Sequence, residues 1–132
     1  MTDGIAFPAL LYNGGYFILQ SMTWLYWITA VCGATFLGWA HCHTDEIPIV
    51  LGFVIIVGAV LGAISPRRFA LSWAITGAPV PIVETLVHFS LIHAPYPPGE
   101  GLPFVALIAY VPAAIGVALG AGARRMIGVS PA

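Results

Sequence analysis

Long apolar stretches without charge alternate with short polar segments along the chain. Four stretches are long enough to cross a membrane as helices, at 22–40, 47–64, 69–92 and 102–123. A helix needs about 20 mainly apolar residues to cross roughly 30 Å of hydrocarbon. Because short loops force consecutive helices to lie antiparallel as neighbours, the pattern predicts an all-α fold. We expect an integral membrane antiparallel bundle of four transmembrane helices.

The chain ends differ in composition from the four predicted spans. Residues 1–21 mix apolar residues with the run Asn-Gly-Gly at 13–15, which is typical of a turn. We therefore expect residues 1–21 to be an N-terminal interfacial segment that turns before the first span. Residues 22–123 would form the four-helix transmembrane domain, and residues 124–132 a short cytoplasmic tail.

Composition excludes several classes of protein. The chain is 60% hydrophobic and 7% charged, with a mean hydropathy of +0.98. Soluble domains are about 45–50% apolar and about 25% charged, and disordered chains are more polar still. The net charge of -1 offers no basic surface for nucleic acid. The high hydrophobic fraction and the low charge favour a location in the lipid bilayer.

The distribution of arginines predicts the orientation. With four spans, Arg67, Arg68, Arg124 and Arg125 all fall on one side of the membrane. Basic residues gather on the cytoplasmic side, so we expect a multi-pass protein of the cell (inner) membrane with both termini in the cytoplasm. The arginines are either topology signals or ligands of anionic lipid headgroups or of an acidic partner surface.

The third span carries the most informative polar residues. Pro79 and Pro81 lack a backbone donor, which predicts a kink in this helix. Glu84 is the one acid inside the predicted spans. A charge there costs about 2.5–3.5 kcal/mol or more, so such acids face protein or water. His88 lies four residues later, on the same helix face. The pair is interpreted as a clasp between helices, a proton-binding relay in a carrier, or a contact to a cofactor or metal.

A second polar cluster lies between the first two predicted spans. His41, Cys42 and His43 carry nitrogen and sulfur donors that zinc and copper accept, and His93 is predicted at the same membrane face. The same residues are also what an ordinary solvated loop contains. Metal binding therefore stays one of two interpretations, and the identity of any cofactor stays unknown.

Small residues at four-residue spacing predict close helix packing. Gly58 and Gly62 lie in the second span, and Gly116 and Gly120 in the fourth. Small residues at this spacing let two membrane helices approach closely. The sequence leaves open whether these residues join helices of one chain or of different subunits.

Motifs of common enzymes do not occur in this sequence. It has no GxSxG, Walker, HExxH or GxGxxG pattern, which favours a protein that is not an enzyme. We expect a non-catalytic structural or accessory subunit of a homo-oligomer or larger membrane complex. One alternative is a small oligomeric transporter or proton-coupled carrier that uses Glu84 and His88. A second is a metal- or cofactor-binding redox component that uses His41, His43, His88 and His93.

Overall fold

The computed structural model describes residues 6–44, 46–95 and 103–128, with side chains described from residue 20 and, in the last range, from residue 106. Helices are the only regular secondary structure among the described residues. Its elements are α1 (Ala6–His43), α2 (Ile47–Ile64), the short 3-10 helix η1 (Pro66–Arg68), α3 (Phe69–Gly77), α4 (Pro79–His88), the 3-10 helix η2 (Pro103–Ala109) and α5 (Tyr110–Met126). Three helical stretches are long and apolar enough to cross a membrane, namely Ile47–Ile64, Pro66–His88 and Ala106–Met126.

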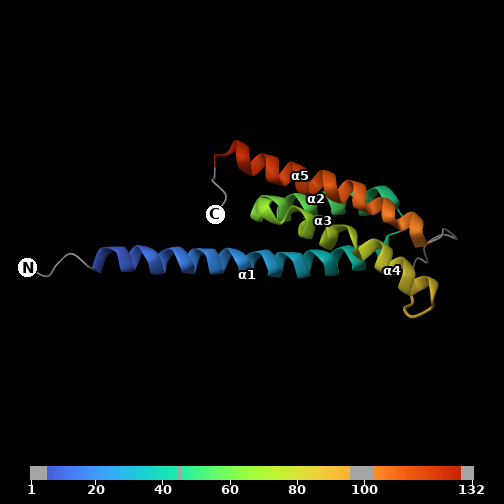
Figure 1. The fold of residues 1–132 in the computed structure, drawn as a ribbon. Helices are drawn as coiled ribbons and strands as arrows, with labels where there is room; N and C mark the ends of the chain where they lie inside the picture. Colours follow the sequence, from blue (N-terminus) through green and yellow to red (C-terminus); the bar gives the residue numbers. More distant parts are fainter. Residues whose placement is uncertain (1–5, 45, 96–102, 129–132) are drawn as a thin grey trace, which may run out of the picture.

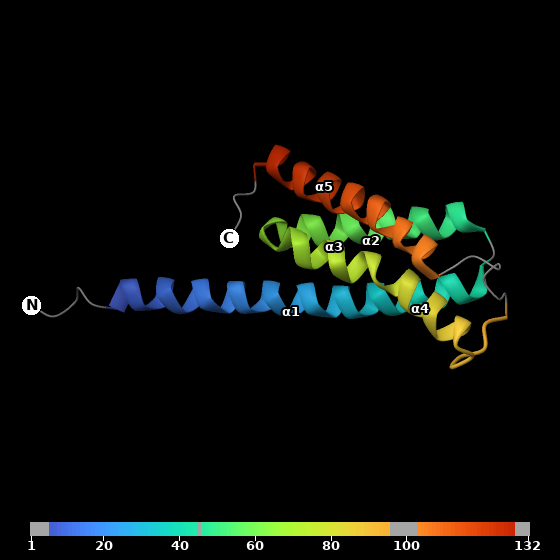
Figure 2. The ribbon, with the colours of Figure 1, turned by 45° about the vertical axis from the view of Figure 1, so that its right-hand side comes forward.

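The helices run alongside one another, and α1 is much the longest. α2 and α5 make the most extensive contact among the described elements, and α1 contacts α2, α3 and α4. Figures 1 and 2 show the N-terminal half of α1 extending beyond the other helices, with no helix beside it in either view. With 38 residues, α1 is roughly 57 Å long at 1.5 Å per residue. The three other stretches are much shorter.

The turn predicted at 13–15 is wrong, because α1 is helical without interruption from Ala6 to His43. Pro8 lies in the first turn of this helix, where its missing N–H has no partner to lose. Glycine inside a helix costs only about 1 kcal/mol relative to alanine, which the uncharged, mainly apolar residues around the run can offset. The helix therefore begins 16 residues before the predicted start of the first span. Contact of residues 1–21 with the membrane surface stays a prediction.

The third predicted span is divided into α3 and α4 at Ala78, directly before Pro79. Neither Pro79 nor Pro81 has an N–H for the carbonyl four residues earlier. The hydrogen-bond chain passes through Ala78, which donates to Ala74 and accepts from Ile82. Figure 2 shows α4 leaving the direction of α3 at this point. α4 ends at His88, so Glu84 lies one turn from the end of its helix, nearer than predicted.

The fourth predicted span also consists of two elements. η2 precedes α5, which begins at Tyr110. Pro112 is the third residue of α5 and so lies in its first turn, where helices tolerate proline. The change from 3-10 to α geometry falls beside this proline.

All four predicted packing glycines lie in the contact between α2 and α5. A Cβ built on Gly58 would lie 3.1 Å from the carbonyl oxygen of Ala113. A Cβ on Gly62, Gly116 or Gly120 would overlap backbone atoms of the opposite helix. The glycines of each helix therefore make room for the main chain of the other, within one chain.

Buried residues of α1 form one stripe along the helix. Tyr26, Ala30, Leu37 and Ala40 are each no more than 2% exposed, and their spacing places them on one face. Leu37 belongs to the main buried cluster, whose other members are Val50, Val54, Val80, Ala106, Ala109 and Ala113. This stripe positions the C-terminal half of α1 against the rest of the molecule.

Candidate functional site

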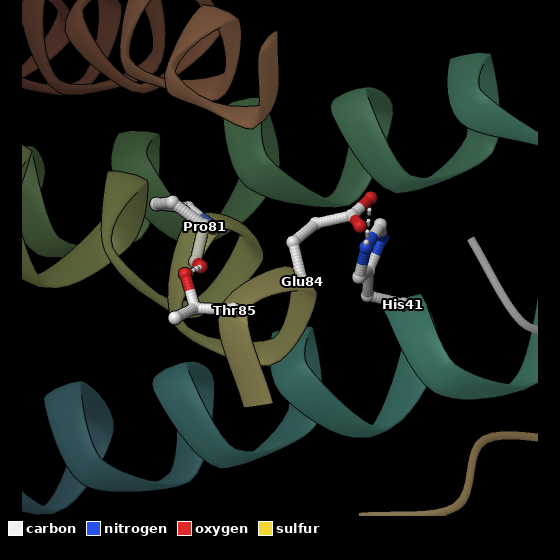
Figure 3. Close-up of polar contacts among 4 residues, drawn as sticks. All are labelled: His41, Pro81, Glu84 and Thr85. Carbon is white, nitrogen blue, oxygen red and sulfur yellow. Dashed lines mark hydrogen bonds and ion pairs between the residues drawn. The ribbon is translucent and has the colours of Figure 1, made fainter. Parts of the chain in front are cut away.

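Glu84 and His41 form an ion pair that joins α4 to α1. His41 Nε2 lies 3.2 Å from Glu84 Oε1, and the two side chains are 15% and 19% exposed. Figure 3 shows the carboxylate reaching from α4 toward the imidazole ring. His41 lies in the last turn of α1. The break at Ala78 sets the direction of α4, and Glu84 projects from its second turn. The pair can hold the two helices together or exchange a proton.

The predicted partner of Glu84, His88, lies elsewhere. Its side chain is exposed and makes an edge contact with Phe89, with 5.4 Å between ring centroids. His88 lies four residues after Glu84 on the same helix, whereas His41 comes close to it through the fold. The Glu84 carboxylate is bonded to His41. Beside this pair, Thr85 donates a hydrogen bond of 2.7 Å to the carbonyl of Pro81 (Figure 3).

The other predicted metal ligands do not converge with His41. His43 bonds through Nδ1 to the carbonyl oxygen of Trp39 at 2.9 Å and stacks on its ring, while His93 is exposed. Burial raises the pKa of the Cys42 thiol, which disfavours the reactive thiolate. Within the described ranges, no three His, Cys, Asp or Glu side chains come together as a metal-binding group.

The predicted arginines lie at the opposite end of the helices from Glu84. Arg124 Nη1 donates hydrogen bonds to the carbonyls of Ala63 and Ile64, at 2.7 and 2.5 Å. The last carbonyls of a helix lack partners within it, so Arg124 caps α2 from α5. Arg67 and Arg125 are exposed.

Arg68 lies against aromatic rings of α1. Its guanidinium carbon is 4.9 Å from the ring centroid of Tyr26 and 5.9 Å from that of Trp27. These are cation–π distances, which arginine favours because its planar group stacks well on rings. The contact joins η1 to α1.

Sequence reasoning missed the buried polar residues that join α1 to α3. The hydroxyl groups of Tyr26 and Ser72 lie 3.0 Å apart, and the two residues are 1% and 0% exposed. Thr76 donates to the Ser72 carbonyl at 2.6 Å. The four-residue spacing of Ser72 and Thr76 within an apolar span was a signal for this contact, because buried hydroxyls need partners.

A further link that the sequence did not reveal connects α3 with α5. The indole N–H of Trp73 donates to the carbonyl of Tyr110 at 2.8 Å. The Tyr110 ring occupies the space where a Cβ on Gly77 would lie. Glycine at position 77 therefore admits the aromatic ring.

These contacts form a set of polar links between helices, among which the part-exposed His41–Glu84 pair joins two ionisable side chains. Comparison of the chain with models of known protein families, with curated proteins and with solved structures found no match.

Proposed function

We propose that this chain is a small polytopic membrane protein that serves as a non-catalytic structural or accessory subunit of a homo-oligomer or larger membrane complex. Two pairs of polar side chains that join α1 to its neighbours support it. Tyr26 bonds to Ser72, and His41 bonds to Glu84. Such contacts hold a bundle together without requiring a substrate.

The observation that carries the proposal is the length of α1. Its roughly 57 Å is nearly twice the roughly 30 Å of a hydrocarbon core, and its N-terminal half has no helix beside it (Figures 1 and 2). The sequence contains no Asp, Glu, Lys or Arg from residue 4 to residue 44. A long helix without charge is stable when another apolar surface covers it. A neighbouring subunit supplies such a surface.

The use of the glycines supports assembly through α1. Gly58 and Gly62 of α2 and Gly116 and Gly120 of α5 are already engaged with each other, so these faces are closed to another subunit. α1 presents large apolar side chains outward, with Trp24 64%, Ile28 59% and Val31 63% exposed. Among the described residues, α1 carries more exposed large hydrophobic side chains than α2, α3, α4 or α5.

The test is the mass of the purified protein in a mild detergent, measured by light scattering after size exclusion. We expect a dimer, a higher oligomer or a complex with a second membrane protein. Deletion of residues 6–19 should reduce assembly and leave the unfolding temperature of the remaining helices within a few degrees. A monodisperse monomer of the full chain, with no accompanying protein, contradicts the proposal.

Cysteine chemistry offers a second readout on the same preparation. Cys32 is exposed on α1, and both cysteines are free. In a Cys42→Ser variant, oxidation should link two copies through Cys32 if α1 helices of neighbouring subunits face each other. The Cys32→Ser variant is the matched control, because its remaining thiol lies near the C-terminal end of α1.

The part-exposed His41–Glu84 pair favours a second candidate function, a small oligomeric proton-coupled carrier. Glu84 follows the division between α3 and α4 at Ala78, and an acid beside an interrupted helix is common in transporters. Glu84→Gln should abolish proton-coupled flux in liposomes. No flux by the unaltered chain, or equal flux in the variant, contradicts this function.

A further inference from the structure

We propose that Arg68 and Arg124 form a binding site for the phosphate of an anionic phospholipid headgroup. The site lies where η1 adjoins α5, with Arg68 against α1 and Arg124 against the C-terminal end of α2, at the predicted cytoplasmic face. The inference rests on the membrane location in the proposed function, and it adds a ligand that the subunit role does not require.

Arg68 carries a donor without an acceptor. Its Nη1 is buried and has no hydrogen-bond partner within the described residues, while the residue as a whole is half-buried. A guanidinium stays charged in proteins and has five N–H donors. A buried donor without a partner is unfavourable, so an oxyanion that lies beside this half-buried, charged side chain is favoured. Tyr26 and Trp27 hold the guanidinium in place.

Arg124 contributes a second donor of the same kind. Its Nη1 is bonded to the C-terminal carbonyls of α2, which fixes the side chain. Its Nε is buried and has no partner in the described part of the chain. α5 contacts η1, so the two arginines come from adjoining elements. A phosphate has several acceptor oxygens and matches the fork geometry of arginine.

The distribution of charge also favours an anion. Glu46 precedes α2 and Glu84 lies on α4, whereas Arg68 belongs to η1 and Arg124 to the last turn of α5. Figure 1 shows α4 at one end of the molecule and the C-terminal end of α5 at the other. No carboxylate of the described ranges pairs with Arg68 or Arg124, since His41–Glu84 is the ion pair found there. An anion from outside the described residues would balance the charges of Arg68 and Arg124.

Aromatic and apolar neighbours favour a lipid as the source of that anion. Trp24 and Trp27 lie on α1 near the level of Arg68, and are 64% and 42% exposed. Tryptophan is enriched at the headgroup level of membranes, where one end of its ring is apolar and the other is wet. A phospholipid satisfies both kinds of surface, with its phosphate on the arginines and its chains along the helices.

The test is lipid retention by the purified chain in a non-ionic detergent, measured by native mass spectrometry. Phosphatidylglycerol, phosphatidylcholine and inorganic phosphate are added separately. We expect retention of phosphatidylglycerol well above the other two. Arg68→Gln should reduce its apparent affinity by roughly fivefold, the factor for ~1 kcal/mol.

Arg125→Gln is the matched control, because it removes the same charge at the same end from an exposed side chain. We expect it to lower retention less than Arg68→Gln does. Arg68→Lys keeps the positive charge but lacks the forked N–H donors of the guanidinium. This variant should therefore bind phosphatidylglycerol more weakly than the unaltered chain does. Circular dichroism of each variant confirms that the helices are intact.

Three outcomes overturn the lipid site. The first two are that phosphatidylcholine or inorganic phosphate is retained as well as phosphatidylglycerol. The third is that Arg68→Gln and Arg125→Gln lower the retention of phosphatidylglycerol equally. Retention is measured on the monomer fraction as well as on any oligomer. A monomeric chain would contradict the proposed subunit function. Because retention is measured on the monomer too, that result is distinguishable from failure of the lipid site.

Discussion

The contact between α2 and α5 and the contact between α1 and its neighbours are built in different ways. In the first, Gly58, Gly62, Gly116 and Gly120 bring main chain against main chain. In the second, Gly33 of α1 makes room for a side chain of α2, that of Val57, rather than for its main chain, and hydrogen bonds join residues far apart in the sequence. Tyr26–Ser72 and His41–Glu84 are 46 and 43 positions apart.

This difference reflects what holds helices together in lipid. Apolar side chains gain little from leaving lipid for protein, so close packing and hydrogen bonds between helices supply the stability. The α2–α5 contact relies on close packing and has no space for an added methyl group at Gly120. The α1 contact adds side-chain hydrogen bonds to its apolar packing, and such bonds tolerate small shifts. We therefore expect α2–α5 to be the rigid unit and α1 to be the helix that adjusts to a neighbouring subunit.

The largest expected effect comes from adding a methyl group to the α2–α5 contact. In Gly120→Ala, the new Cβ would overlap the carbonyl of Ala59, so the two helices must move apart. Overpacking of this kind costs about 1–3 kcal/mol. The free energy of unfolding, measured by SDS titration in detergent micelles, should fall by that amount.

Gly122→Ala is the matched control on the same helix, because a Cβ there meets no atom within 4 Å. Alanine is a better helix former than glycine by roughly 0.5–1 kcal/mol. The control should leave stability unchanged or raise it slightly. Equal destabilisation by both variants would show that α5 does not depend on the contact at Gly120.

A smaller effect is expected at the buried hydroxyl pair of the α1 contact. Tyr26→Phe keeps the ring beside Arg68 and removes the bond to Ser72. Loss of one buried hydrogen bond costs about 1 kcal/mol, and the same SDS titration should detect it. Tyr110→Phe serves as the control, because Trp73 bonds to the backbone carbonyl of Tyr110. A loss as large in the control would contradict the importance of the Tyr26–Ser72 bond.

Several features of the fold followed from local sequence patterns. Apolar length predicted helical segments, and three of the resulting stretches are long and apolar enough to cross a membrane. Pro79 and Pro81 marked the division between α3 and α4, because each proline removes a hydrogen bond to the carbonyl only one turn earlier in the chain. Glycine spacing identified Gly58 and Gly120 as residues of a close contact, although the partner helix required the structure.

Other features depended on how the helices come together. The run at 13–15 resembled a turn, yet the cost of a few weak helix formers is small against the rest of a 38-residue helix. The local four-residue rule favoured His88 as the partner of Glu84. The bond to His41 depends on the packing of α4 against α1, which no local pattern encodes.

The smallest effect, and the sharpest test of the α1 contact, is the coupling between His41 and Glu84. Hydrogen bonds between membrane helices contribute about 0.6 kcal/mol on average and up to ~1.7 kcal/mol. A double-mutant cycle of His41→Gln and Glu84→Gln should give a coupling energy in this range. The single variants should each lower stability by less than Gly120→Ala does.

His88→Gln provides the control that separates the two possible partners of Glu84. Its side chain is exposed and contacts Phe89, so its cycle with Glu84→Gln should give no coupling. Coupling of Glu84 to His88 without coupling to His41 would show that Glu84 interacts within α4 and not with α1. Of the two hydrogen bonds described here between a side chain of α1 and another helix, Tyr26–Ser72 would then remain. We would expect α1 to be held less firmly than the contact between His41 and Glu84 implies.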